Sequence, residues 1–146
     1  MFNRVVMVLA LLVCGNVVAE TWMPVADAAT GERLVVSVDT INIEKYTKSS
    51  GEEGLQISAV MRYINKEPLP PFLSVIDVGE CLENNKGQIV VALPDHTTHT
   101  YFWSETDTTM VGAQGQFLCG YVKEKYKPQT IKKSFVRAGI QNAHYI

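Results

Sequence analysis

The alternation of side-chain types between Leu55 and Ile64 constrains the fold of this chain more than any other feature. Every second residue of this segment is apolar or aromatic, in the order Leu55, Ile57, Ala59, Met61 and Tyr63. Successive side chains of a β-strand point to opposite faces of a sheet, so a period of two predicts a strand with one buried face. We therefore expect residues 55–64 to form the best-defined strand of the molecule.

Shorter strand patterns, rich in β-branched and aromatic residues, recur along the chain with turn signals between them. They cover residues 21–26, 34–38, 39–43, 72–78, 88–93 and 100–104. Residues 79–87 read as a polar turn that carries Cys81, and 65–71 as a surface connector because its three prolines exclude a helix or a central strand. No strand–helix–strand alternation appears, so we expect an antiparallel sheet with at most one or two helices packed on it.

The segment Gln116–Tyr126 fits two structures. Its apolar residues suit a strand, but four of them also fall on one side of a helix, namely Leu118, Tyr121, Val122 and Tyr126. Gly120 lowers the helix propensity, and Pro128 ends either element. The remaining tail, 127–146, fits one more strand around Ser134–Val136 or a short helix.

The first 19 residues have the pattern of a secretory signal peptide. Arg4 supplies the positive charge, and nine uncharged residues, Val5–Val13, form an apolar segment. A bilayer-spanning helix needs about 20 residues, so this segment is too short. Val17 and Ala19 suit cleavage before Glu20. We expect residues 20–146 to form a single exported β-rich domain in the periplasm or on the outer cell surface, with a lipoprotein anchored through Cys14 as the lesser alternative.

Composition excludes several kinds of partner. Without Arg4 the 13 basic residues fall to 12 against 15 acidic ones, which leaves a net charge near −3. Such a chain has no electrostatic footprint for nucleic acid and no polybasic patch for anionic lipid. No transmembrane segment is expected after cleavage of the leader. Two cysteines remain, Cys81 and Cys119, and in an oxidising compartment they most simply pair with each other, the alternative being two free thiols.

No motif in the sequence demands a particular chemistry. His96 and His99 stand three apart in a threonine-rich turn, where they would point to opposite faces rather than share a metal ion. Glu105 and Asp107 follow an aromatic strand, as a glycosidase pair could, but no cleft pattern accompanies them. Motifs for a nucleophilic serine, a phosphate loop or a zinc protease are absent from the sequence. We expect neither an enzyme nor a metal ion or cofactor.

Aromatic residues give the best indication of a binding surface. Trp22 lies near the start of the mature chain, and Tyr101, Phe102 and Trp103 are consecutive in one strand. Such aromatics belong either to a core or to a binding face. Because side chains alternate along a strand, Phe102 should point away from Tyr101 and Trp103, so one of the two sets is expected at the surface.

The order of these features resembles the surface-adhesin protein E-like family of Gram-negative bacteria. The resemblance spans Thr21 to Tyr126 and rests on Trp22, Asp39, Ile41, Cys81, Trp103 and Cys119. It implies a curved antiparallel sheet with a helix near the C-terminal end, over Gln114–Tyr126, clasped by the cysteine pair. It also implies a role in binding host matrix proteins.

Size, export and aromatics together favour a non-enzymatic binding protein. We expect its partner to be a host matrix protein or a bacterial envelope protein, met through the sheet edge or the aromatic face. A periplasmic inhibitor or immunity protein that blocks a toxic or wall-degrading enzyme would have the same size, leader and disulfide. The sequence does not identify the ligand or the oligomeric state.

Overall fold

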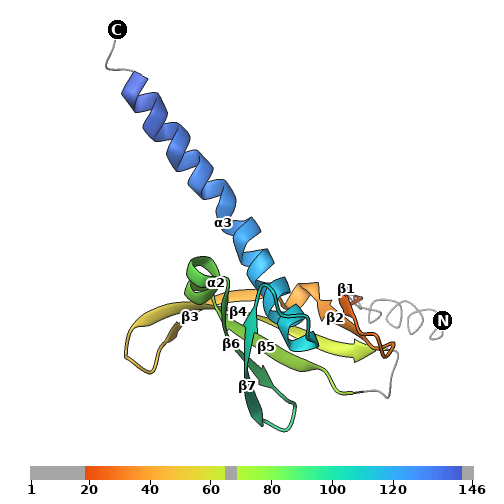
Figure 1. Cartoon of the computed structure of the whole chain (residues 1–146). Coiled ribbons are helices and arrows are strands. Elements are labelled where there is room, and N and C mark those ends of the chain that lie inside the picture. Colours follow the sequence, from red (N-terminus) through yellow and green to blue (C-terminus); the bar gives the residue numbers. More distant parts are fainter. Residues whose placement is uncertain (1–18, 65–68, 143–146) are drawn as a thin grey trace, which may run out of the picture.

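The computed structural model describes residues 19–64 and 69–142, so the predicted leader lies outside the described residues except for its last position. An antiparallel sheet and two α-helices account for this part of the chain, which confirms the predicted α+β class (Figure 1). The elements are β1 (Trp22–Asp27), β2 (Arg33–Ser37), the 3-10 helix η1 (Val38–Thr40), β3 (Asn42–Thr47), β4 (Glu53–Ile64), β5 (Phe72–Asp77), α2 (Val78–Asn84), β6 (Lys86–Ala92), β7 (Thr98–Ser104) and α3 (Met110–Asn142).

The long strand β4 organises the sheet. The strand order is β1-β2-β4-β5-β6-β7, and β3 also pairs with β4. Residues 53–58 of β4 pair with β3, whereas 61–64 pair with β2, so two short strands share the two halves of one long strand. β5 pairs with residues 56–61 of β4. All six pairings are antiparallel, as the turn-rich sequence predicted.

The strand predicted from Asp39 begins later than expected. Residues 38–40 form η1, and β3 starts only at Asn42. The hydroxyl of Thr40 accepts a hydrogen bond from Val60 N at 2.9 Å and donates one to Ser37 O at 2.8 Å. The chain passes from β2 to β3 at this point, and the Thr40 side chain accepts from a backbone N–H of β4 there. The break between the two strands therefore leaves this N–H with a hydrogen-bond partner.

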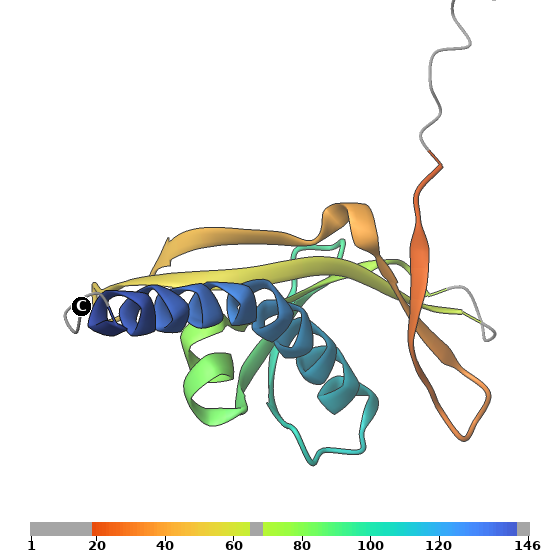
Figure 2. The ribbon, with the colours of Figure 1, turned by 90° about the horizontal axis from the view of Figure 1, so that it is seen from above.

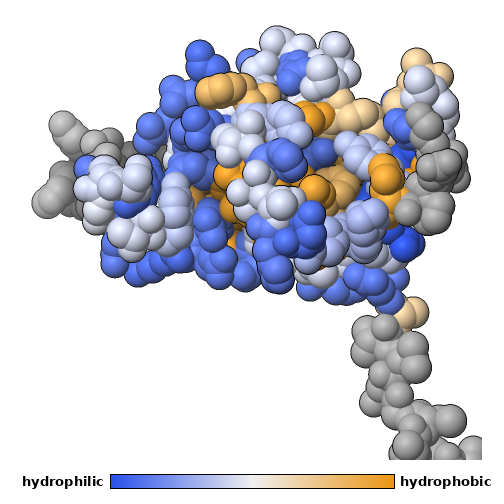
Figure 3. All heavy atoms as spheres, turned by 90° about the horizontal axis from the view of Figure 1, so that it is seen from below, coloured by the Kyte–Doolittle hydropathy of each residue, from blue (hydrophilic) through white to orange (hydrophobic). Residues whose placement is uncertain are grey.

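One face of the sheet packs against α3 and forms the core. Ile57, Ala59 and Met61, on the predicted apolar face of β4, are fully buried, and Leu118 and Val122 of α3 belong to the same cluster. Full burial of each large apolar side chain contributes about 1.5–3 kcal/mol. The first turns of α3 pack on the sheet, and the rest of the helix projects away from it (Figure 1). Figure 2 shows the molecule from above, and Figure 3 shows it from below, where hydrophobic patches lie among polar surface.

The segment predicted as a polar turn around Cys81 contains the helix α2. Asp77 caps this helix, because its Oδ1 accepts a hydrogen bond from Glu80 N at 2.8 Å. Asn85 ends it in a left-handed conformation at φ 53°. Val78 and Cys81 are buried on its inner side. Seven residues are marginal as an isolated helix, so these tertiary contacts decide the structure.

A disulfide joins Cys81 to Cys119, as the two-cysteine pattern predicted. It links α2 to α3, so α3 is held to the sheet through the short helix rather than directly to a strand. The ambiguous segment Gln116–Tyr126 is helical, and the helix extends well beyond it in both directions. The strand considered around Ser134–Val136 is not formed, since α3 continues to Asn142.

Candidate binding surface

The aromatic strand β7 places its side chains on both faces of the sheet. Cross-strand partners share a face, and Trp103 opposes Gly87 whereas Phe102 opposes Gln88. Trp103 is 3% exposed and belongs to the core, while Phe102 is 76% exposed and Tyr101 is 43% exposed. The predicted alternation is therefore present, and Phe102 is the aromatic side chain that it leaves in solvent.

Trp103 supports the helix rather than the surface. A Cβ atom added at Gly115 would lie 2.3 Å from Trp103 Cγ, so α3 passes directly over the indole ring. The indole N–H is buried and finds no acceptor among the described residues. The close approach of Trp103 explains why position 115 of α3 needs a glycine.

Trp22 is not brought together with the other aromatics. It lies in β1, at the opposite end of the strand order from β7. Its half-buried ring stacks under the guanidinium of Arg62, with Arg62 Cζ 4.2 Å from the ring centroid. This cation–π contact joins the edge strand to β4.

The outer edge of β7 carries backbone groups with which no other described strand pairs. In an antiparallel pair, residues that exchange both backbone hydrogen bonds alternate with residues that exchange none. Glu105 N bonds to Asn85 O at 3.1 Å and Leu93 N bonds to Thr97 O at 2.9 Å, which fixes the phase of this alternation between β6 and β7. The bonded β7 residues are then 99, 101 and 103, and the N–H and C=O groups of 98, 100 and 102 are directed away from β6.

No device that normally blunts an edge is present on β7. Its seven residues, Thr98–Ser104, include no proline and no Asp, Glu, Lys or Arg, and its register with β6 is continuous. Native sheets usually protect such edges with charges, prolines or bulges. An unprotected edge of this length is a template for an added strand.

The two other edge strands are protected. β1 contains Pro24, and its register with β2 shifts between Pro24 and Ala26. β3 carries Glu44 and Lys45, and Glu44 accepts a hydrogen bond from Gln56 Nε2 at 2.9 Å. β7 therefore lacks the proline, the register shift and the charged residues that protect β1 and β3.

An open hollow of about 560 Å³ lies beside the end of β7 that follows Phe102. Phe102 and Ser104 line it together with charged side chains from neighbouring elements, namely Glu80, Lys86 and Asp107. A strand added along β7 would extend next to this hollow. The hollow offers aromatic and charged contacts to its side chains.

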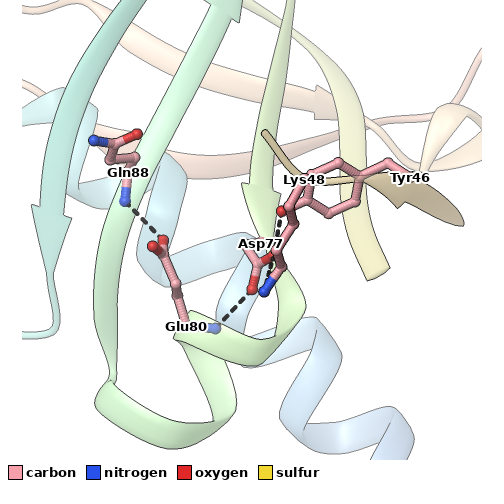
Figure 4. A network of polar contacts seen from close by, with 5 residues as sticks. All are labelled: Tyr46, Lys48, Asp77, Glu80 and Gln88. Atoms are coloured by element: carbon pink, nitrogen blue, oxygen red, sulfur yellow. Dashed lines mark hydrogen bonds and ion pairs between the residues drawn. The ribbon is translucent and has the colours of Figure 1, made fainter. Parts of the chain in front are cut away.

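A polar network at the start of α2 connects this helix to the neighbouring strands (Figure 4). The hydroxyl of Tyr46 donates to Asp77 Oδ2, and Lys48 Nζ lies 3.7 Å from the same oxygen. Burial, followed by the hydrogen bond to Asp77 and the charge of that group, raises the pKa of Tyr46 to about 12. Glu80 Oε2 accepts from Gln88 N at 3.0 Å and so connects α2 to β6. These contacts join β3, β5, β6 and α2.

Burial alone would raise the pKa of Asp77. The hydrogen bonds from Tyr46 and from Glu80 N, together with the charge of Lys48, outweigh burial and lower the pKa of this carboxyl group below its ordinary value. The carboxylate therefore stays charged at neutral pH. The contacts of Asp77 hold these elements of the fold together.

His96 lies in a turn, His99 on a strand and Asp107 just before a helix. His96 adopts φ 68° in the turn between β6 and β7. His99, on β7, pairs with Val91 of β6. Asp107 Oδ1 accepts a hydrogen bond from Thr109 N at 2.9 Å just before α3 begins. In residues 19–64 and 69–142, no group of three or more potential metal ligands occurs.

No protein-family model, no curated protein and no solved structure matches this chain. The resemblance to the surface-adhesin protein E-like family therefore stays a prediction from the residues that carry it. Within the part of the chain that the structure describes, no helix has both the length and the hydrophobicity needed to cross a membrane. The disulfide is compatible with an exported protein.

Proposed function

We propose that the mature chain is a non-enzymatic binding protein of the periplasm or outer cell surface, which holds a protein partner in extended conformation along β7. The single observation that carries the proposal is the unprotected outer edge of β7. Its backbone groups at 98, 100 and 102 point away from β6, and the exposed ring of Phe102 lies beside them. Strand addition uses such groups for affinity and neighbouring side chains for selectivity.

The resemblance to adhesins fits this mode of binding. A host matrix protein or an envelope protein would supply an exposed extended segment, and the hollow near Phe102 would accept one of its side chains. A periplasmic inhibitor that plugs a catalytic cleft stays the alternative proposal.

Amide hydrogen exchange tests the proposal residue by residue. The probe is a capped, uncharged seven-residue peptide of alternating threonine and valine, added to the mature protein at up to 1 mM. We expect the amides of Thr98, Thr100 and Phe102 to exchange rapidly in the free protein and to become protected by the peptide. The amides at 99, 101 and 103, which bond to β6, should be protected in both states.

A proline at one outward position gives the matched comparison. Thr100→Pro removes an outward N–H without removing a bond to β6, whereas Thr100→Ala keeps the backbone donor. We expect the proline variant to bind the peptide at least tenfold more weakly and the alanine variant to bind it like the wild type. Absence of protection at the three outward amides, or equal binding by both variants, would contradict the proposal.

A further inference from the structure

A second concave surface is lined by residues of β4, β5, β6, β7 and the first turns of α3. This groove has a volume of about 400 Å³, within the range of about 300–1,000 Å³ that small-molecule sites occupy. None of the described residues that line it is charged. Its walls are apolar and aromatic side chains, chiefly Leu69, Phe72, Val91, Leu93, Tyr101 and Val111.

Two polar residues occupy core positions under this groove. Ser74 is fully buried between Phe72 and Ile76 on the inner face of β5, and Gln114 of α3 is 2% exposed. Ser74 Oγ donates to Gln114 Oε1 at 2.8 Å, and Gln114 Nε2 donates to the hydroxyl oxygen of Tyr63 at 3.2 Å. Polar residues in an otherwise apolar core break the pattern that stability favours, and such breaks are typical of functional sites.

The polar chain ends at the lining of the groove. Tyr63 and Gln114 both line the groove. The ring centroids of Tyr63 and Phe72 lie 5.5 Å apart, and the two rings form an aromatic wall. Because Tyr63 uses its oxygen to accept from Gln114, its own hydrogen can be donated to another group. Burial raises the pKa of Tyr63, so the phenol keeps that hydrogen at neutral pH. The groove thus combines apolar walls with a hydrogen-bond donor.

We infer that this groove binds a small, neutral and largely apolar molecule, whose hydrogen-bond acceptor meets the hydroxyl of Tyr63. A charged ligand does not fit, because no lining residue would pair with it and burying an unpaired charge is costly. The half-exposed side chain of Leu69 at the rim, 50% accessible, would be covered by such a ligand. The site is separate from the outer edge of β7 and does not depend on the function proposed for that edge.

The neutral dye Nile red, which carries a carbonyl acceptor, tests the inference on the mature protein. We expect saturable binding of one dye molecule with a blue-shifted emission. The anionic dye 1-anilinonaphthalene-8-sulfonate should bind at least tenfold more weakly. No saturable binding of Nile red up to 50 µM, or equal binding of the two dyes, would overturn the inference.

Three variants locate the dye. Val111→Trp should fill the groove and abolish binding, and Tyr63→Phe should weaken it about two- to tenfold through loss of one hydrogen bond. Leu82→Ala removes an exposed leucine from α2, outside the groove, and should leave binding unchanged. Retained binding in Val111→Trp, or equal loss in Leu82→Ala, would show that the dye binds elsewhere.

A second measurement keeps the test valid if Val111→Trp fails to fold. In the wild-type protein, amide and side-chain NMR shifts on addition of Nile red should be confined to the groove, around Tyr63, Phe72 and Val111. Displacement of the dye by the threonine–valine peptide would place both ligands in one site and overturn the claim that the groove is separate. Failure of the peptide to bind, with dye binding retained, would leave this site standing and remove only the function proposed for β7.

Discussion

The side chain of Asp77, at the end of β5, joins this strand to β3 and to α2. Its Oδ1 caps α2, and its Oδ2 accepts from Tyr46 of β3 and lies near Lys48. A carboxylate is suited to this position because both oxygens accept hydrogen bonds and the charge favours a helix N-terminus. The sequence shows an aspartate before a glycine-containing segment but gives no sign that a tyrosine 31 residues away would reach it.

The charge of Asp77 makes stability depend on pH. We expect Asp77→Asn to lower the free energy of unfolding by about 1–2 kcal/mol at pH 7, since asparagine keeps the cap but not the charged acceptor. The native pKa is lowered, so the carboxylate stabilises the fold above its unfolded pKa of about 4, and this contribution is lost as the pH falls through the native pKa. Urea unfolding across this pH range should show the difference between the two proteins closing. A difference that stays constant down to pH 2 would rule the charge out as its source.

At the scale of the helix, two glycines of α3 should respond in opposite ways to the same substitution. Gly115→Ala places a Cβ atom 2.3 Å from Trp103 Cγ, and we expect this overpacking to cost about 1–3 kcal/mol. Gly120 has no heavy atom within 4 Å of its added Cβ atom, so Gly120→Ala should stabilise the protein by about 0.5–1 kcal/mol through helix propensity alone. Thermal and urea unfolding of both variants measure the effects. Stabilisation by both would mean that α3 does not cross Trp103 closely.

The strands followed from local patterns, whereas the helices were only partly predictable. A helix near the C-terminal end was expected, but α2 was missed and α3 is longer than expected. A period of two in β4 and the aromatic alternation of β7 are local patterns, and the structure has strands at both. Gly112 and Gly115 lower the local helix propensity of α3, yet Gly115 is what allows the helix to pack on Trp103. In α3, tertiary packing therefore outweighs the low helix propensity of its glycines. α2 was missed for the same reason, since a seven-residue helix depends on its cap and on the disulfide.

The two proposed binding surfaces, the outer edge of β7 and the groove beside Tyr63, were only partly predictable from the sequence. Alternation along β7 indicated that Phe102 and Trp103 would face opposite ways. Strand order, however, depends on long-range pairing, so the sequence could not show that β7 is an edge or that Trp22 lies at the far end of the sheet. The polar chain through Tyr63 and Gln114 joins residues 51 apart, and no local pattern marks it.

At the scale of the whole molecule, the core lies between one face of the sheet and α3, and one disulfide bond adds to its stability. α3 packs on one side of the sheet, and Cys81–Cys119 closes a loop of 38 residues between α2 and α3. The chain-entropy relation gives about 4 kcal/mol for a loop of this length, against about 5–15 kcal/mol for the total stability of a typical domain. We therefore expect this single bond to supply a large share of the stability, and formation of the native state to depend on an oxidising compartment.

The double variant Cys81→Ala/Cys119→Ala tests this dependence without leaving a free thiol. We expect the variant to keep its sheet and to lose about 4 kcal/mol of unfolding free energy, because both cysteines are buried and alanine leaves only small voids beside the loss of the cross-link. Urea unfolding of the variant, and of the wild type with and without dithiothreitol, measures the loss, and the reduced wild type should unfold close to the variant. A loss below about 1 kcal/mol would mean that packing of Leu118 and Val122 alone holds α3 on the sheet. In that case the cysteine pair would contribute little to the fold, and the protein would be equally stable in a reducing compartment.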